Sequence, residues 1–186
     1  MTAQIPNSFL LDEKKLSIVG VHGGGLFSPL DHGLQPLPRI TSCWRGYVCT
    51  YTTLSYKLIL DRLQVNLGSE GPPIREVHPV FGDAGLFDTV YDHLNLHIDF
   101  TGGILLADGF IRELYVHMGF HPAWKYETVF ELAVSQGYIL ETRDVSRSMA
   151  ELREKMIRQP LQPDRDASSH HVQAWIASTF KHNYRF

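Results

Sequence analysis

The stretch Tyr91–His121 reads YDHLNLHIDFTGGILLADGFIRELYVHMGFH, and its first ten residues alternate almost perfectly between apolar and polar side chains. A period of two places the two sets on opposite faces of a β-strand. The apolar positions predict a buried face formed by Leu94, Leu96, Ile98 and Phe100. The polar positions predict a solvent-facing side formed by His93, Asn95, His97 and Asp99.

The second half of this stretch predicts two further strands. Gly102-Gly103 interrupts the pattern, and paired glycines in a strand indicate a bulge, a tight turn or a close backbone approach. Asp108-Gly109 is a typical hairpin-turn dipeptide. The next strand is expected to bury Leu114, Val116 and Met118, with Tyr115 and His117 on its other face.

Aromatic and β-branched residues crowd Thr41–Leu54, which reads TSCWRGYVCTYTTL and predicts another strand. Tyr56–Leu67 follows as its hairpin partner. Arg45 and Tyr47 fall on one face of this strand and Trp44 on the other. The rings either pack across strands or flank Arg45 in a site for a carboxylate or phosphate.

The patterns together predict an α+β protein with a curved antiparallel sheet, sandwich- or barrel-like, and two C-terminal helices. We expect one domain, residues 1–186, with a β-rich core over 1–145 and a helical segment over 146–186. Ser148 and Glu151 form a capping-box pattern for the first helix. The second helix is expected from Ser168 or Ser169 to about Asn183 on an apolar stripe, Val172, Trp175, Ile176, Thr179 and Phe180.

Composition limits the functions to consider. The chain has 186 residues, a formal net charge of −3 and no long basic run, so nucleic-acid binding is not favoured. No apolar stretch is long enough to cross a membrane, and the N-terminus lacks a signal-peptide pattern, so we expect a cytoplasmic protein. The only cysteines, Cys43 and Cys49, are expected to be reduced thiols.

Two further segments are candidate sites. His22–Ile40 contains three consecutive glycines and three prolines, and long loops of this kind often line functional sites. On the polar face of the first strand, His93, His97 and Asp99 are weak candidates for metal ligands, with His117 or His121 from a neighbouring strand. The alternative is a solvated face that is rich in histidine, and we expect no cofactor.

Three segments resemble an uncharacterised family of bacterial proteins. Thr41–Tyr47 resembles its T-x-CWRGY strand, Phe100-Thr101-Gly102 its F-T-G segment, and Tyr115–Phe120 its YVHMG-aromatic strand. The family has no established activity, so the resemblance implies a β-rich fold over residues 41–145 and leaves the function open.

Two functional hypotheses follow. The first is a non-catalytic protein-binding module of the immunity or antitoxin type, which neutralises a partner effector in the bacterial cytoplasm. Tryptophan, tyrosine and arginine dominate the energetics of protein interfaces. The predicted binding residues are therefore Trp44, Arg45, Tyr47, Tyr115 and His117. The alternative is a small hydrolase or metal-dependent enzyme that uses a His/Asp/Cys cluster on the sheet face, for which the sequence carries no recognisable motif.

Overall fold

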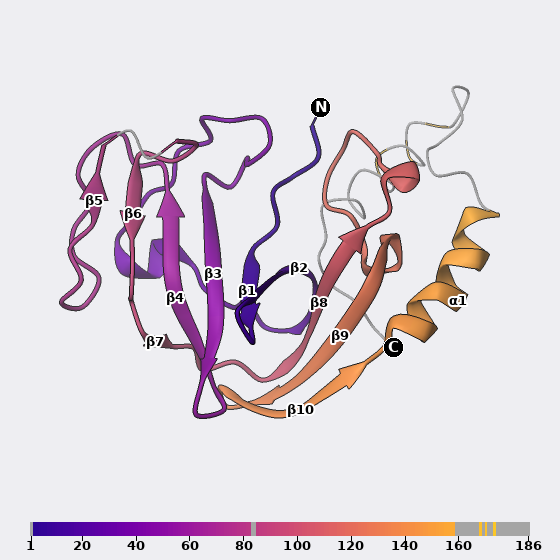
Figure 1. Ribbon diagram of the computed structural model, residues 1–186. Coiled ribbons are helices and arrows are strands. Elements are labelled where there is room, and N and C mark those ends of the chain that lie inside the picture. Colours follow the sequence, from indigo (N-terminus) through magenta and orange to yellow (C-terminus); the bar gives the residue numbers. More distant parts are fainter. Residues whose placement is uncertain (1, 83–84, 159–167, 169, 171–172, 174–186) are drawn as a thin grey trace.

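The computed structural model describes residues 2–82 and 85–158, together with 168, 170 and 173. Ten strands of these residues form one sheet, with short 3-10 turns between some of the strands and one α-helix after the last strand (Figure 1). The strands are β1 (Ser8–Leu11), β2 (Lys14–Gly23), β3 (Tyr47–Leu54), β4 (Lys57–Val65), β5 (Val80–Phe81), β6 (Thr89–Tyr91), β7 (Leu96–His97), β8 (Gly102–Phe110), β9 (Tyr126–Ser135) and β10 (Tyr138–Asp144). The helical elements are η1 (Pro29–His32), η2 (Arg112–Leu114), η3 (Ala123–Lys125) and α1 (Ser146–Ile157).

The sheet curls until its two sides meet at one end. The strand order is β10-β9-β8-β2-β1-β3-β4-β6-β5, and Tyr138 of β10 also pairs with Lys57 of β4. The amide of Leu58 donates to the carbonyl of Gly137, and the amide of Ile139 donates to the carbonyl of Tyr56. The hairpin ends therefore join at the bottom of Figure 1, from where β4 runs upward and β10 runs to the right, toward α1. The predicted α+β class with a curved sheet is confirmed in this half-closed form.

One strand pair departs from the predicted antiparallel arrangement. β1 and β3 run parallel, with Ser8 opposite Thr50, so the sheet is mixed. The long segment between β2 and β3 carries the chain back to the start of the sheet before β3 begins. This pairing brings the N-terminal segment beside the start of β3, where the candidate site lies.

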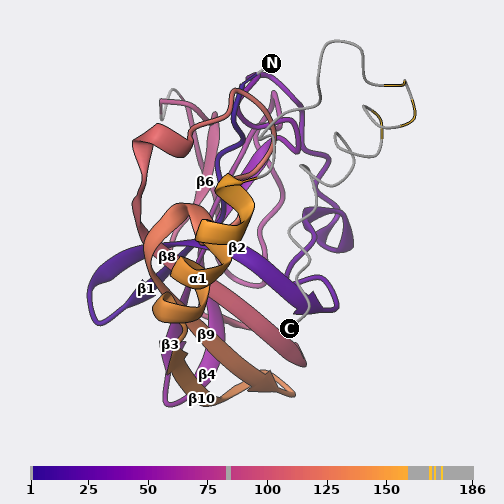
Figure 2. The same ribbon diagram turned by 90° about the vertical axis from the view of Figure 1, so that its right-hand side faces the viewer.

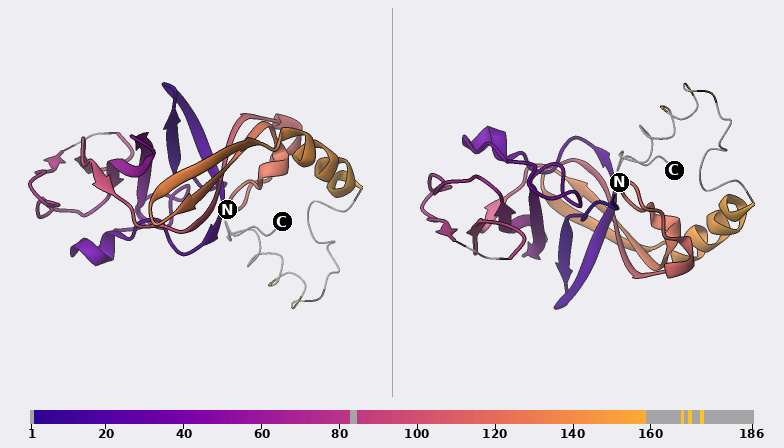
Figure 3. Two further views of the ribbon diagram at one scale, coloured as in Figure 1. Left: turned by 90° about the horizontal axis from the view of Figure 1, so that it is seen from below. Right: turned by 90° about the horizontal axis from the view of Figure 1, so that it is seen from above.

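The described residues form three apolar clusters: an inner and an outer core on the two faces of the curled sheet, and a small cluster of Cys43, Val48 and Phe87. β8 contributes to both the inner and the outer core because its run Ile104–Ala107 is apolar without interruption, as is typical of a strand covered on both faces. Ile104 and Leu106 belong to the inner core, and Leu105 and Ala107 to the outer one. Figure 2 shows α1 lying across the outer side of β8 and β9. The views from below and from above in Figure 3 show α1 and the β5–β6 pair at opposite sides of the described molecule.

The central stretch buries the predicted residues but does not form the predicted strands. Leu94, Leu96, Ile98 and Phe100 are all buried. His93 and Asn95, however, have φ values of 55° and 45°, which break the extended backbone and leave only the two-residue β7 between β6 and β8.

The hairpin turn predicted at Asp108-Gly109 is wrong. Asp108 remains in the ladder opposite Thr128, and the ladder continues to Phe110 opposite Tyr126. Gly109 takes a φ of 67°, and the register of the ladder is the same on both sides of it. The strand predicted over Leu114–Met118 is also absent, because the chain turns through η2 and continues as a loop.

The first C-terminal helix begins earlier than predicted. α1 starts at Ser146, whose amide donates to Asp144 Oδ1 (2.9 Å) and whose hydroxyl accepts from the amide of Val129 (2.9 Å). Ser148 therefore lies inside the helix, and the predicted capping box is wrong. The second predicted helix lies outside the described residues, apart from the isolated positions 168, 170 and 173. None of the described helices is long and apolar enough to span a membrane.

Candidate functional site

Arg45 is anchored in the loop just before β3. Its Nε donates to the carbonyl of Tyr47 (2.6 Å), and its Nη2 donates to the carbonyl of Ile5 (3.1 Å) and to Asn7 Oδ1 (2.8 Å). The loop can turn here because Gly46 has a φ of 74°, and a Cβ at that position would lie 2.6 Å from the carbonyl oxygen of Leu37. The guanidinium is thus held by the backbone of the N-terminal segment and of β3.

Two aromatic rings flank this guanidinium. Its Cζ lies 5.3 Å from the ring centre of Tyr47 and 5.6 Å from that of Phe120. Contacts of this kind stabilise a cation by about 0.5–2 kcal/mol, more when water is excluded. No carboxylate of the described residues pairs with Arg45. Within the described chain, its positive charge is therefore balanced by the two rings and by the oxygens of Ile5, Tyr47 and Asn7.

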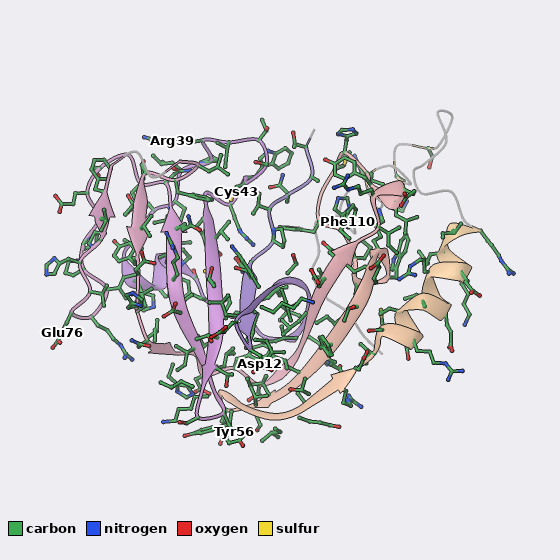
Figure 4. The ribbon with its side chains drawn as sticks, viewed as in Figure 1. Asp12, Arg39, Cys43, Tyr56, Glu76 and Phe110 are labelled. Atoms are coloured by element: carbon green, nitrogen blue, oxygen red, sulfur yellow. The ribbon has the colours of Figure 1, made fainter. Side chains whose placement is uncertain are left out.

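Arg45 lies in the wall of a cavity of about 440 Å³. The walls come from the N-terminal segment, β2, the loop after β2, the start of β3 and the loop before η3, and no lining residue is acidic. The lining residues are Gln4, Asn7, Val21, Gly24, Gly25, Leu26, Phe27, Trp44, Arg45, Tyr47 and Phe120. Figure 4 labels Cys43, two residues before Arg45, at the wide end of the sheet, opposite Tyr56 at the narrow end.

The structure brings together three of the five predicted binding residues. Trp44, Arg45 and Tyr47 all line the cavity, and the side chain of Trp44 is 47% exposed. Part of the predicted site loop His22–Ile40 lines it too. Tyr115 and His117 do not, and the sequence interpretation missed Asn7 and Phe120, which do.

Tyr115 and His117 instead belong to an aromatic cluster around His121. The centre of the His121 ring lies 4.6 Å from that of Phe110 and 5.1 Å from that of Tyr115, and Tyr115 meets His117 edge-on at 4.8 Å. Figure 4 labels Phe110 at the upper end of β8. Because Phe120 stacks on Arg45 and the next residue joins the cluster, one loop connects the cavity and the cluster.

Two basic residues lie in or near this cluster: the half-buried His121, which the sequence offered as a possible metal ligand, and the buried Lys125, which it did not single out. Both ring nitrogens of His121 are buried without a hydrogen-bond partner among the described residues. Burial, with a smaller contribution from Lys125, lowers the pKa of His121 to about 4. Lys125 is 5% exposed, and its Nζ lies 5.3 Å from the Trp124 ring centre. Burial lowers the pKa of Lys125 to about 8.

Replacement of Lys125 by methionine is expected to stabilise the protein. Since the folded pKa of about 8 is below the ordinary 10.5, the unfolded chain holds more protons between these values, and stability should rise with pH there. At neutral pH the buried ammonium carries the full penalty, so Lys125→Met should add about 1–2 kcal/mol to the free energy of unfolding. Urea unfolding of the wild type and of Lys125→Met near neutral pH measures this gain in the free energy of unfolding. Lys155→Met, on the exposed face of α1, serves as control, and an equal gain there would contradict the assignment.

Neither cysteine is placed for nucleophilic chemistry. Both are free and buried. Burial raises the pKa of Cys49 to about 12, which keeps it a thiol at neutral pH. The Cys43 thiol donates to the carbonyl of Tyr47 (3.3 Å). Each thiol is therefore part of the packing around β3.

The three candidate metal ligands are not gathered into a site. His93 lies 88% exposed with its Nδ1 4.0 Å from Asp61. His97 Nε2 lies 3.2 Å from the carbonyl of Gly137, and its ring meets that of Tyr138 edge-on. Among the described residues, no group of three or more His, Cys, Asp or Glu side chains is arranged to hold a metal ion.

Comparisons with known proteins add no relative from which a function could be transferred. No family model matches the chain, and neither a curated protein nor a solved structure is significantly similar to it.

Proposed function

We propose that this chain is a non-catalytic protein-binding module that receives an anionic group of its partner in the Arg45 cavity. The observation that supports the proposal is the half-buried guanidinium, which faces a cavity without an acidic lining residue and pairs with no carboxylate of the described chain. Burying an uncompensated charge costs free energy. A partner carboxylate would supply the missing charge and strengthen the contact as water leaves the cavity.

The rim of the cavity suits a protein partner. Trp44, which lines the cavity, is 47% exposed and so presents a large apolar surface beside Arg45. A tryptophan and an arginine at the centre of a patch are the residue types that contribute most to binding energy. An immunity-type role in the bacterial cytoplasm, in which the partner is a toxic effector, is the form of this proposal that we favour.

A hydrolytic or metal-dependent function has less support. The residues that such chemistry needs are dispersed: Cys49 is buried with a raised pKa, His93 points to solvent, and His117 packs on Tyr115. Catalysis requires a nucleophile, a base and a stabilising group within reach of one reacting atom. None of the described clusters combines these three roles.

Substitution of Arg45 is expected to release the partner. The tagged full chain, Arg45→Lys and Gly25→Val are used in pull-downs from the native host, and co-purified proteins are identified by mass spectrometry. Arg45→Lys keeps a charge but loses the planar donor group, so we expect the captured partner to fall roughly ten- to a hundredfold. Gly25→Val should act similarly, because Gly25 lines the cavity and a Cβ there would meet no atom within 4 Å, so the larger side chain adds bulk at the site without a clash in the fold.

Arg75→Lys is the matched control, because Arg75 is exposed and lies outside the cavity lining. It should retain the partner, and thermal melts of all variants separate lost binding from lost folding. A partner that is retained equally by wild type, Arg45→Lys and Gly25→Val would contradict the proposed site.

A further inference from the structure

Arg45 and Asn7, which both line the cavity, each carry a donor group that makes no hydrogen bond within the described chain. Arg45 engages Nε and Nη2, and no described residue accepts from its Nη1. Asn7 Oδ1 accepts from Arg45 Nη2 and also from the amide of Cys49 (2.9 Å). Two donors on one atom identify that atom as the oxygen, so the other amide atom, Nδ2, carries the two N–H groups. Asn7 Nδ2 also makes no hydrogen bond within the described chain.

These donors define the charge of the ligand. Both belong to residues of the cavity wall, and Arg45 is the single charged side chain among the lining residues. A carboxylate carries one negative charge and two acceptor oxygens, which matches one guanidinium and one neutral amide. A phosphate monoester carries about −1.5 to −2 and would remain undercompensated here.

The apolar part of the cavity wall indicates which chemical group carries the carboxylate of the ligand. Leu26, Phe27 and Phe120 are among the apolar residues that line the cavity, whose volume of about 440 Å³ falls in the range that holds compact ligands. The side chain of an aspartate or glutamate brings a carboxylate with only one or two methylene groups and would leave this space unfilled. A chain-terminal residue carries a carboxylate and a complete side chain on the same Cα.

The loop after β2 can accommodate an incoming backbone. Gly24 and Gly25 are exposed, line the cavity, and make no hydrogen bond through their amides within the described chain. A Cβ at either position would meet no atom within 4 Å. The open edge therefore offers backbone N–H groups to an extended peptide, as in other sites that capture chain termini.

We propose that the Arg45 cavity binds the C-terminal carboxylate and the last, apolar side chain of a partner polypeptide. This inference rests on the proposed protein-binding function and specifies which part of the partner enters the site. Arg45 Nη1 and Asn7 Nδ2 bind the carboxylate, and the apolar wall packs against the side chain.

Short peptides test the inference on the full chain by calorimetric titration. One polar hexapeptide sequence is prepared with a final Phe, Leu or Val, each as the free acid and as the C-terminal amide, and N-acetyl-phenylalanine represents a small free acid. At least one free acid should bind, and its amide should bind at least roughly tenfold more weakly, since a charge-assisted hydrogen bond is lost. Gly25→Val should weaken the acid by a similar factor with an unchanged melting temperature, and Arg75→Lys should leave the affinity unchanged.

Three results would overturn the inference. These are equal affinity for acid and amide, binding by none of the free acids, and N-acetyl-phenylalanine binding as tightly as the best peptide, which would assign the cavity to a small acid. The pull-down separates this inference from the proposed function. A partner that depends on Arg45 but is not displaced by the best peptide keeps protein binding and removes terminal recognition. If the peptide binds but no Arg45-dependent partner is captured, recognition of a chain terminus is kept and the proposed partner binding is removed.

Discussion

Gly102→Ala is expected to destabilise the protein by more than about 4 kcal/mol, the largest effect of any single methyl group that we anticipate in this chain. Gly102 begins β8 opposite Gly23 of β2, with a φ of 152° that side chains rarely adopt. A Cβ at Gly102 would lie 1.9 Å from the carbonyl oxygen of His22 and 2.9 Å from the ring of Phe100.

The cost is high because neither neighbour can move independently. The oxygen of His22 is part of the β2 backbone, and the Phe100 ring belongs to the inner core. Relief of the overlap would require β2 and β8 to separate where the ladder ends. Marginal stabilities of about 5–15 kcal/mol leave little reserve for such a change.

Gly25→Ala is the matched control, two residues beyond the end of β2. Its Cβ would meet no atom within 4 Å, so we expect a change of no more than about 0.5 kcal/mol. Urea unfolding followed by circular dichroism compares the two variants, and soluble yield records a Gly102→Ala chain that fails to fold. A Gly102→Ala protein that unfolds within about 1 kcal/mol of wild type would show that the two backbones are not held this closely.

The sequence predicted burial better than it predicted strands. The alternation from Leu94 to Phe100 identified four buried side chains, although positive φ values at His93 and Asn95 divide the segment. Leu114, at the end of η2, and Val116, in the loop after it, are likewise buried. An extended loop that crosses a core also exposes alternate faces, so a period of two reports burial without requiring a ladder.

The candidate site was predictable only where its residues are neighbours in sequence. Trp44, Arg45 and Tyr47 stood out because aromatic residues and an arginine occur together. Asn7 lies 38 positions from Arg45, and the parallel β1–β3 pairing brings them together. Sequence periodicity predicts which residues face inward but not which strands become neighbours. Tyr115 and His117 lie outside the cavity lining, and the segment expected to carry them as a strand is a loop.

The second large effect is expected for His121→Phe, which should reduce the loss of folding stability at acidic pH. The folded pKa of about 4 lies below the ordinary 6.5, because burial disfavours the charged ring and Lys125 adds repulsion. Between these values the unfolded chain binds more protons than the folded one, so the stability of the wild type should fall as pH decreases from about 6.5 to about 4. The whole shift corresponds to about 3 kcal/mol, and we expect about 2 after allowing for the part of the ring that water reaches.

Phenylalanine suits the position because His121 already packs as an aromatic ring against Phe110 and Tyr115, with both nitrogens unpaired within the described chain. Urea unfolding of the wild type and of His121→Phe at about pH 7 and about pH 4.5 measures the difference. The pH range between about 4.5 and about 7 separates the effect of His121 on stability from the effects of Asp108 and Asp144. A hydrogen bond from Lys14 lowers the pKa of Asp108, and hydrogen bonds from Ser146 lower that of Asp144, so both lose their contributions only below the ordinary 3.8.

Protonation of His121 should also affect binding in the Arg45 cavity, because the preceding residue in the chain, Phe120, lines that cavity. A charged His121 would be driven from its aromatic cluster toward water, and Phe120, which stacks on Arg45, would move with it. Binding of the partner to the wild type should therefore weaken over the pH range in which stability falls, and His121→Phe should remove both dependences together. His93→Phe is the control, because His93 is 88% exposed and should change neither profile. If His121→Phe abolished the stability change but left the acid loss of binding intact, the loop that carries Phe120 would not couple the two regions.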